Sequence, residues 1–247
     1  MSKAKELMIE TIEDLKSIDA LSEQKSPGND VFLPLIQPMS NETVGAMQVF
    51  QGEMISKLVY VSLAIPPAGI DSHMVFAFTS KDSPIPHFTL DSVSLPGHLA
   101  FHLDLIPKVD LGANLNYMKA CYQPLLEHFK KANDIKGFTP AHLSPYQNAV
   151  MSPFMLANRS TEEAFDQLGP IVKSYLHHFG KILRQGLGQP TMDDIKGLNM
   201  AKRDQANRDI LFSKEIDPVW NQIEGFIGAE TGSAMRKVLR NLDPEQI

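Results

Sequence analysis

The chain contains a single cysteine, Cys121, among its 247 residues. One cysteine cannot form an intrachain disulfide, and it excludes a thiolate cluster for zinc. Cys121 falls on the apolar stripe of a predicted helix, which is typical of a buried structural thiol rather than a nucleophile. A reducing compartment fits this composition best, and we expect the protein to be cytoplasmic.

Other signals are also absent. The formal charge of −6 leaves no excess of basic residues, so a general nucleic-acid binder is excluded. No apolar run approaches the length of a membrane span, and the first 19 residues carry five acidic side chains, which neither a signal nor a transit peptide favours. The chain has no Gly-x-Ser-x-Gly elbow, Walker A loop or Gly-x-Gly-x-x-Gly fingerprint, so nucleotide cofactors have no support.

What remains is typical of a folded domain, with 43% apolar and 21% charged residues. Apolar residues recur at helical spacing over 2–22 and change to a period of two, or to short apolar runs, over 44–105. Turn sequences rich in Gly, Pro and Asp separate these runs, so we predict an antiparallel meander. A stretch rich in proline, 140–158, is expected to add a strand or two.

Helical spacing returns over 114–131, 160–184, 191–212 and 218–240, and Ser160 and Glu163 form a capping-box pattern. Strands in the middle with helices around them predict an α+β fold whose sheet is covered by helices. We expect a single domain over 1–247, divided as follows. The N-terminal helix lies within 1–25, the antiparallel strands within 44–107, and a mainly helical part with one or two strands within 114–240.

Histidines cluster between positions 73 and 102. In a strand, His98, His102 and Asp104 point to one face, which suggests a metal-dependent hydrolase as one reading. However, residues four apart on a strand are about 13 Å apart, too far for His98 and His102 to share an ion. We therefore expect no metal site and a polar sheet face instead. Asp91 offers a second reading, because a carboxyl beside an apolar sheet has a raised pKa and can exchange protons with His73 of the neighbouring run.

The order of these segments resembles the ferredoxin-dependent bilin reductases and their relative, red chlorophyll catabolite reductase. The resemblance is carried by HMVFAFTSKDSPIPHFTLDSV (73–93), by the Asp-Leu-x-Pro-x-x-Asp-Leu element at 104–111, by SPYQNAVMSPFMLAN (144–158) and by the C-terminal segment 202–220. It spans about residues 44 to 240. It implies a three-layer α/β/α sandwich that holds an open-chain tetrapyrrole between its sheet and its C-terminal helices.

The same resemblance assigns roles to residues. Asp91 matches the carboxylate that protonates the bilin, and His73 matches the relay histidine if one residue is inserted in the turn. The second acidic position falls on Asp204 or Asp209, and we prefer Asp204. Ser62 stands where some members carry a glutamate, so reduction of a particular vinyl group is in doubt. The residues expected around the substrate are Ser62, Phe76, Phe88, Asn148, Ser152 and Arg208.

Members of this family bind no metal or flavin and take electrons one at a time from ferredoxin, whose 2Fe-2S cluster stays in the partner. The resemblance therefore implies ferredoxin and a linear tetrapyrrole as partners. Cations for the propionate arms or the docking surface are expected among Lys57, Arg159, Lys196, Lys202, Arg203 and Arg208. A tetrapyrrole carrier without catalytic activity is the alternative on the same scaffold.

Overall fold

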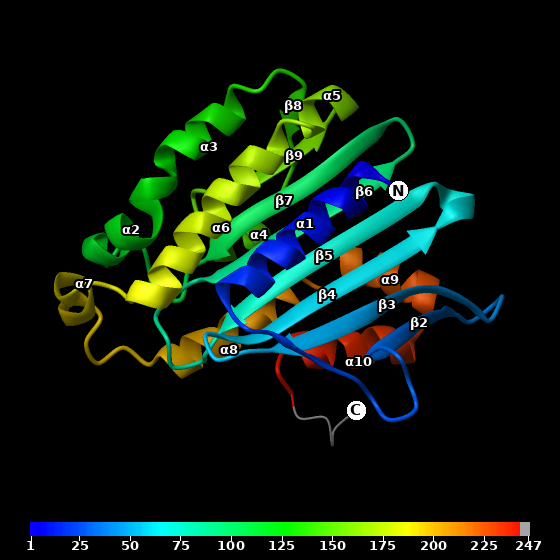
Figure 1. Cartoon of the computed structure of the whole chain (residues 1–247), viewed down its shortest axis with the longest axis horizontal. Helices are drawn as coiled ribbons and strands as arrows, with labels where there is room; N and C mark the ends of the chain where they lie inside the picture. The colour runs from blue at the N-terminus through cyan, green and yellow to red at the C-terminus, as the bar shows by residue number, and fades with distance from the viewer. Residues whose placement is uncertain (243–247) are drawn as a thin grey trace.

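The computed structural model describes residues 1–242 and shows an α+β fold in three layers, with helices on both faces of one antiparallel sheet (Figure 1). The strands are β1 (Ser22–Gln24), β2 (Leu33–Gln37), β3 (Glu42–Gln51), β4 (Ile55–Ile65), β5 (Ile70–Thr79), β6 (His87–Leu95), β7 (His98–Ile106), β8 (Phe138–Pro140) and β9 (Leu156–Ser160). Their order in the sheet is β1-β3-β4-β5-β6-β7-β9-β8, and β2 also pairs with β3. The α+β sandwich expected from the sequence is confirmed.

The helices are α1 (Lys3–Ile18), α2 (Leu115–Tyr122), α3 (Leu126–Asn133), α4 (Pro145–Val150), α5 (Glu162–Phe165), α6 (Leu168–Gln185), α7 (Gln189–Asp194), α8 (Met200–Leu211), α9 (Val219–Ile227) and α10 (Ala229–Leu239). In Figure 1, α1 and α6 cross the sheet in front, and α8, α9 and α10 lie behind it. We call these sides the α1–α6 face and the α8–α10 face. None of the helices in the described part of the chain combines the length and apolarity needed to cross a lipid bilayer.

Two separate hydrophobic cores follow from the alternation of side chains along the strands. In β5, Val75 and Ala77 pack into the core under α1 and α6, while Met74, Phe76 and Phe78 pack into the core under α8–α10. In β7, the apolar residues Leu99, Phe101, Leu103 and Leu105 all belong to the α1–α6 core. The polar residues that alternate with them therefore lie on the α8–α10 face.

One row of paired residues crosses four strands on the α8–α10 face. Met74 of β5 pairs with Asp91 of β6, Asp91 pairs with His102 of β7, and His102 pairs with Ala157 of β9. Residues paired across strands share a face, with neighbouring strands about 4.8 Å apart. We call these four residues the Asp91 row. The row places two ionisable side chains next to each other above the sheet.

The predicted meander over 44–105 is confirmed as β3–β7, but the short strands β1 and β2 were not expected. All four helical stretches predicted after residue 110 are interrupted, at 123–125, 166–167, 195–199 and 228. A short 3-10 turn at Gln123–Leu125, which contains Pro124, separates α2 from α3, and Gly228 separates α9 from α10 with a positive φ of 83°. The helical capping signal near 160 lies one residue later than predicted, because Thr161 is the N-cap and Ser160 ends β9.

The two ends of the main strand path are formed by very short strands. β1 and β8 have three residues each, and β8 ends at Pro140, which has no amide hydrogen to donate. Short edge strands and edge prolines leave little backbone available for pairing with another chain. The interior strands β4–β7, which carry the polar residues of the Asp91 row, are thus protected on both sides.

Candidate functional site

A cavity of about 150 Å³ lies between the α8–α10 face of the sheet and the C-terminal helices. Its floor is formed by β5, β6 and β7, its far wall by the end of α8 and the start of α9, and one side by the segment that contains α4. Its lining includes Met74, Phe76, Phe78, His87, Thr89, Asp91, His102, Leu143, Gln147, Met151, Leu211, Phe212, Asp217, Val219 and Trp220. Most of these side chains are apolar, so a few polar groups face an otherwise dry space.

Asp91 and His102 form the polar centre of this cavity. His102 Nδ1 lies 3.5 Å from Asp91 Oδ2. The second carboxylate oxygen, Asp91 Oδ1, and the second ring nitrogen, His102 Nε2, are buried and have no hydrogen-bond partner within the described chain, and the same holds for Thr89 Oγ1. Buried polar groups are costly to leave unsatisfied, so unpaired atoms that gather in one cavity indicate a place for a polar ligand.

The electrostatics of the cavity stabilise the protonated form of His102 relative to a free imidazole. Burial opposes the charge on this imidazole, but the hydrogen bond and the negative charge of Asp91 outweigh it, so the pKa of His102 is raised. Asp217, in the loop between α8 and α9, lines the opposite wall. Burial, reinforced by the charge of Asp91, raises the pKa of Asp217. The cavity thus carries groups able to hold protons on both its sheet wall and its helix wall.

Asp104 lies on the same sheet face, two residues along β7 from His102, but it is sealed off. Its carboxylate accepts hydrogen bonds from Ser152 N at 2.7 Å and from Ser152 Oγ at 2.5 Å. Burial raises the pKa of Asp104 to about 7. Asp104 therefore anchors the segment that follows α4 and does not line the cavity.

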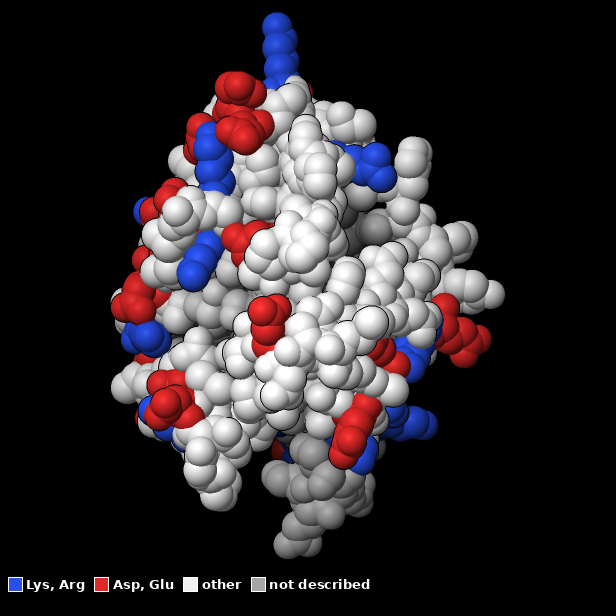
Figure 2. Space-filling view, turned by 90° about the vertical axis from the view of Figure 1, so that its right-hand side faces the viewer, with Lys and Arg blue, Asp and Glu red and all other residues white. Residues whose placement is uncertain are grey.

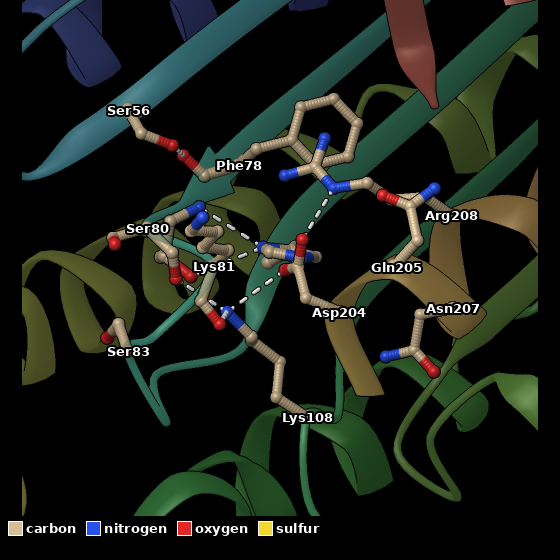
Figure 3. A network of polar contacts seen from close by, with 12 residues as sticks. Ser56, Phe78, Ser80, Lys81, Ser83, Lys108, Asp204, Gln205, Asn207 and Arg208 are labelled. Atoms are coloured by element: carbon tan, nitrogen blue, oxygen red, sulfur yellow. Dashed lines mark hydrogen bonds and ion pairs between the residues drawn. The ribbon is translucent and has the colours of Figure 1, made fainter. Parts of the chain in front are cut away.

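Asp204, on α8, is the centre of a buried network of charges (Figure 3). Its carboxylate lies 2.7 Å from His87 Nε2, 3.0 Å from Lys108 Nζ and 2.8 Å from Arg208 Nε. Lys108 Nζ also donates to Ser80 O at 2.6 Å. Although burial opposes ionisation, the hydrogen bond of His87 and the charges of Arg208 and Lys108 hold the pKa of Asp204 well below its usual range. Asp204 is an ionised anchor that fastens α8 to the sheet.

His87 connects this network to the cavity wall. Its Nδ1 accepts a hydrogen bond from Thr79 N at 3.1 Å, which leaves the Nε2 hydrogen facing Asp204. Burial lowers the pKa of His87 to about 4, so the ring is neutral at physiological pH. Arg208 completes the network, since its guanidinium carbon lies 3.8 Å from the centre of the Phe78 ring, as Figure 3 also shows.

The expectation that His73 works beside Asp91 is wrong. His73 pairs with Ser92, one residue away from Asp91, so its ring lies on the α1–α6 face. There Nδ1 accepts a hydrogen bond from Tyr60 Oη at 2.8 Å, and Nε2 donates to Asp71 Oδ1 at 2.9 Å. The residue of β5 that faces Asp91 is Met74. Because side chains alternate between the two faces along a strand, an alignment error of one residue assigns a histidine to the wrong face of the sheet.

The preference for Asp204 as the second acid also fails on geometry. Asp204 is absent from the cavity lining and is held ionised by three neighbours. A carboxylate in that state has no proton to give near neutral pH. The alternative, Asp209, does not fit this role either, because its side chain is partly exposed and pairs with Arg240. The acid that the C-terminal segment does present to the cavity is Asp217.

The residues expected around the substrate divide into those inside and those outside the cavity. Phe76 and Phe88 both contribute to its lining, although the ring of Phe88 packs against Phe179 on the α1–α6 face. Ser62 pairs with His73 and lies on that same face. Asn148 lines a neighbouring hollow rather than the cavity. The remaining two, Ser152 and Arg208, are engaged by Asp104 and Asp204, as described above.

The expected cations also take varied positions. Lys57 donates to Val238 O at 3.2 Å, at the end of α10, and burial lowers its pKa to about 8. Arg159 is exposed beside His98 in a separate hollow, and Lys202 is exposed on α8. At the end of the molecule seen in Figure 2, basic and acidic side chains are interspersed and no patch of one sign forms.

The three side chains considered as metal ligands of a hydrolase, His98, His102 and Asp104, do not converge on one site. His98, at the start of β7, lines a separate hollow together with Arg159, and Asp104 is bonded to Ser152. Among residues 1–242, no three His, Cys, Asp or Glu side chains are placed to hold one metal ion. Cys121 is buried, and burial raises its pKa to about 12, which fits the structural thiol expected from the sequence.

Sequence reasoning missed two members of the site, His102 as the partner of Asp91 and Asp217 as the acid of the far wall. The pairing of His102 with Asp91 could have been predicted by counting residues outward from the short turn between β6 and β7, which places the two residues opposite each other. Asp217 carries no such signal. It reaches the cavity only because the loop between α8 and α9 turns back over the sheet.

Comparisons with known proteins give a match in fold. No family model matches the chain, and no curated protein matches it. Among solved structures, it is similar to selenomethionine-labelled phytochromobilin synthase from tomato in complex with biliverdin, with a TM-score of 0.75 and 19% sequence identity over 96% of this chain and 82% of that one. This similarity supports, at the level of fold, the resemblance to bilin reductases drawn from the order of the sequence elements.

Proposed function

We propose that this protein reduces an open-chain tetrapyrrole with electrons from a reduced ferredoxin, at the cavity that contains Asp91 and His102. The observation that carries the proposal is the buried Asp91–His102 pair, whose unpartnered oxygen and nitrogen face an apolar cavity. A fold shared with phytochromobilin synthase, crystallised with biliverdin, supports the choice of substrate. Fold alone does not define a reaction, so the polar groups of the cavity carry the chemical argument.

Reduction of one double bond of the substrate consumes two electrons and two protons. The 2Fe-2S cluster of ferredoxin gives its electrons singly, and each added electron makes the conjugated system more basic. A proton held nearby then traps the reduced species. His102, whose protonated form Asp91 stabilises, supplies one proton from the sheet wall, and Asp217 supplies the other from the helix wall. The apolar residues around them exclude water, so protons arrive from these groups in a fixed orientation.

The end of α8 forms part of the cavity wall, so we assign the docking of the partner to the side of the molecule that carries this helix. Lys196, Lys202 and Arg203 lie in or just before that helix and would attract an acidic ferredoxin. Arg208, which the sequence assigned to the same surface, is buried against Asp204 and is not available to a partner. The docking site is therefore smaller than the sequence suggested.

The test is anaerobic addition of ferredoxin, its reductase and NADPH to the protein mixed with biliverdin, followed by absorption spectroscopy. We expect a spectral shift on binding and a product absorbing at shorter wavelength on reduction. Asp91→Asn should lower turnover about 10²- to 10⁴-fold, the range for loss of a general acid, because His102 loses the carboxylate that stabilises its protonated form. Asp71→Asn, which alters the His–Asp pair on the opposite face, is the matched control and should retain activity.

Two outcomes would contradict the proposal. If wild-type protein gives no spectral shift with biliverdin, the cavity does not bind this class of ligand. If it binds biliverdin but yields no product under reducing conditions, the protein is a carrier and not a reductase.

A further inference from the structure

The cavity is too small for the whole of the proposed substrate. A cavity of about 150 Å³ holds one benzene ring. The cavity around Asp91 has this volume, about 150 Å³. An open-chain tetrapyrrole contains four five-membered rings, so only one of them fits beside Asp91 and His102. The remaining rings need a second space within reach of the first.

Such a space lies next to the cavity. A hollow of about 310 Å³, which we call the outer hollow, is lined by polar side chains of Asn133, His142 and Asn148 and by Ala157 of β9. Leu143 belongs to the lining of both the cavity and the outer hollow. Leu143 therefore lies between the two spaces.

The sheet gives both spaces a common floor. His102 pairs with Ala157, so the Asp91 row runs from the cavity directly into the outer hollow. Two strand spacings separate Asp91 from Ala157, a distance of about 10 Å. A flat molecule of several linked rings, lying across the strands, would cover this distance with one end at Asp91 and the other over β9.

The segment that carries Leu143 is fastened at its two ends. Ala141 N donates to Ala157 O at 2.9 Å, and Ser152 N donates to Asp104 Oδ2 at 2.7 Å. Between these anchors, the hydrogen bonds found in the described chain stay within the segment, as in the capping box of Ser144 and Gln147. The segment can thus shift without loss of bonds to the sheet, and Leu143 is only partly buried.

We propose that Leu143 is a positioning residue that divides one extended binding site into two compartments. The reacting ring lies against Asp91 and His102, and the rest of the ligand lies in the outer hollow. There, amide and imidazole groups suit the lactam and carboxylate groups of a tetrapyrrole. This inference rests on the proposed function, because it assigns the outer hollow to the same substrate. A site divided in this way binds elongated ligands more tightly than compact ligands of equal polarity.

The test is a spectroscopic titration of biliverdin with two variants that fill the outer hollow or its entrance, Asn148→Trp and Leu143→Trp. Asn148 is exposed, so its replacement should leave the fold intact. Each variant is expected to raise the Kd at least 10-fold, and Leu143→Ala is expected to speed association several-fold. Tyr146→Trp is the matched control, because Tyr146 lies on the same short helix, is 66% exposed and lines neither space. Its Kd should equal that of the wild type.

The outcomes separate this inference from the proposed function. If wild-type protein binds biliverdin and Asn148→Trp binds it equally well, the two-compartment site is wrong and the proposed function stands. If the control Tyr146→Trp weakens binding as much as Asn148→Trp, the effect comes from the segment as a whole, and the role of the outer hollow is again overturned. If wild-type protein shows no spectral shift, the proposed function itself has failed.

Discussion

Two His–Asp pairs lie on opposite faces of the same sheet, and they differ in what surrounds them. In the pair formed by His73 and Asp71, both ring nitrogens have partners, and Asp71 also accepts a hydrogen bond from Ser2 at the start of α1. In the pair formed by His102 and Asp91, the contact is longer and one atom of each side chain is unpaired. The first pair ties α1 to the sheet, and the second is open to a ligand.

The difference shows how the same two residue types serve structure or chemistry. Once both nitrogens of a buried imidazole are satisfied, its proton is fixed and its contribution is to stability. A buried imidazole with a free nitrogen carries a desolvation cost of about 1–3 kcal/mol, which a hydrogen bond from a ligand or a bound water offsets. Proximity of His to Asp is thus a weak sign of function, and the unsatisfied atoms are the stronger one.

The largest loss of stability is expected at a third His–Asp pair, His87 and Asp204. There, two buried cations also pair with the carboxylate, so we assign the network a structural role. Asp204→Ala leaves Lys108 and Arg208 buried without a counter-charge, so we expect a loss of about 3–5 kcal/mol in the free energy of unfolding. Urea unfolding followed by circular dichroism measures it. Asp209→Ala, which removes an exposed partner of Arg240, should cost below about 1 kcal/mol. Equal losses in the two variants would contradict the structural role of the network.

The next effect concerns Asp104, which shares the cavity face but is sealed by Ser152. Its pKa is raised from 3.8 to about 7 in the folded protein. The folded state therefore keeps a proton that the unfolded chain loses, so this carboxyl lowers the free energy of unfolding as pH rises from about 4 to 7, by up to about 4 kcal/mol. In Asp104→Asn this part of the pH dependence should be absent. Urea unfolding at pH 4.5 and 7.5 tests it, and parallel curves for wild type and variant would contradict it.

Replacing each of the two histidines by glutamine, in separate variants, tests the comparison most directly. His102→Gln should lower biliverdin turnover about 10²-fold, because the proton held beside Asp91 is lost, with little change in stability. His73→Gln should do the reverse, costing about 1–3 kcal/mol of stability and leaving turnover within a few-fold of the wild type. Turnover and unfolding are measured on the same preparations. A larger loss of turnover in His73→Gln than in His102→Gln would reverse the assignment of the two faces.

The smallest effect is expected at Tyr60, whose hydroxyl bonds to His73 Nδ1. Tyr60→Phe removes this one buried hydrogen bond and should cost about 0.5–1.5 kcal/mol in the free energy of unfolding. Biliverdin binding should be unchanged, since Tyr60 lies on the α1–α6 face. A spectral change of bound biliverdin in this variant would show that the two faces are coupled.

The sequence was sufficient for the layered fold, because the change from helical to strand periodicity and the Gly and Pro turns are local signals. It also brought Asp91 to attention as a carboxyl within an apolar strand. The sequence could not show on which face of the sheet His73 lies, because a shift of one residue in strand register moves a side chain to the opposite face. The pattern of apolar residues did predict that His98, His102 and Asp104 share a face, and the structure confirms it.

Other parts of the site depend on tertiary contacts that no short stretch encodes. Asp204 and Asp217 both lie in the C-terminal part, but the resemblance offered only Asp204 and Asp209 as the second acid, and Asp217 was not among its candidates. Only the folded chain shows that Lys108 and Arg208 hold Asp204 ionised, while the loop after α8 carries Asp217 to the cavity. Their opposite pKa shifts follow from these neighbours and not from local sequence.

The short strands β1 and β8 have a further consequence if the protein admits a large ligand, as proposed above. Movement of the segment around Leu143 would uncover apolar surface beside β9, and exposed strands next to apolar surface promote self-association. Here the strand beyond β9 is only three residues long and ends in Pro140, so a neighbouring molecule finds few backbone groups with which to extend the sheet. Opening of the proposed binding site would therefore carry a low risk of aggregation along this edge.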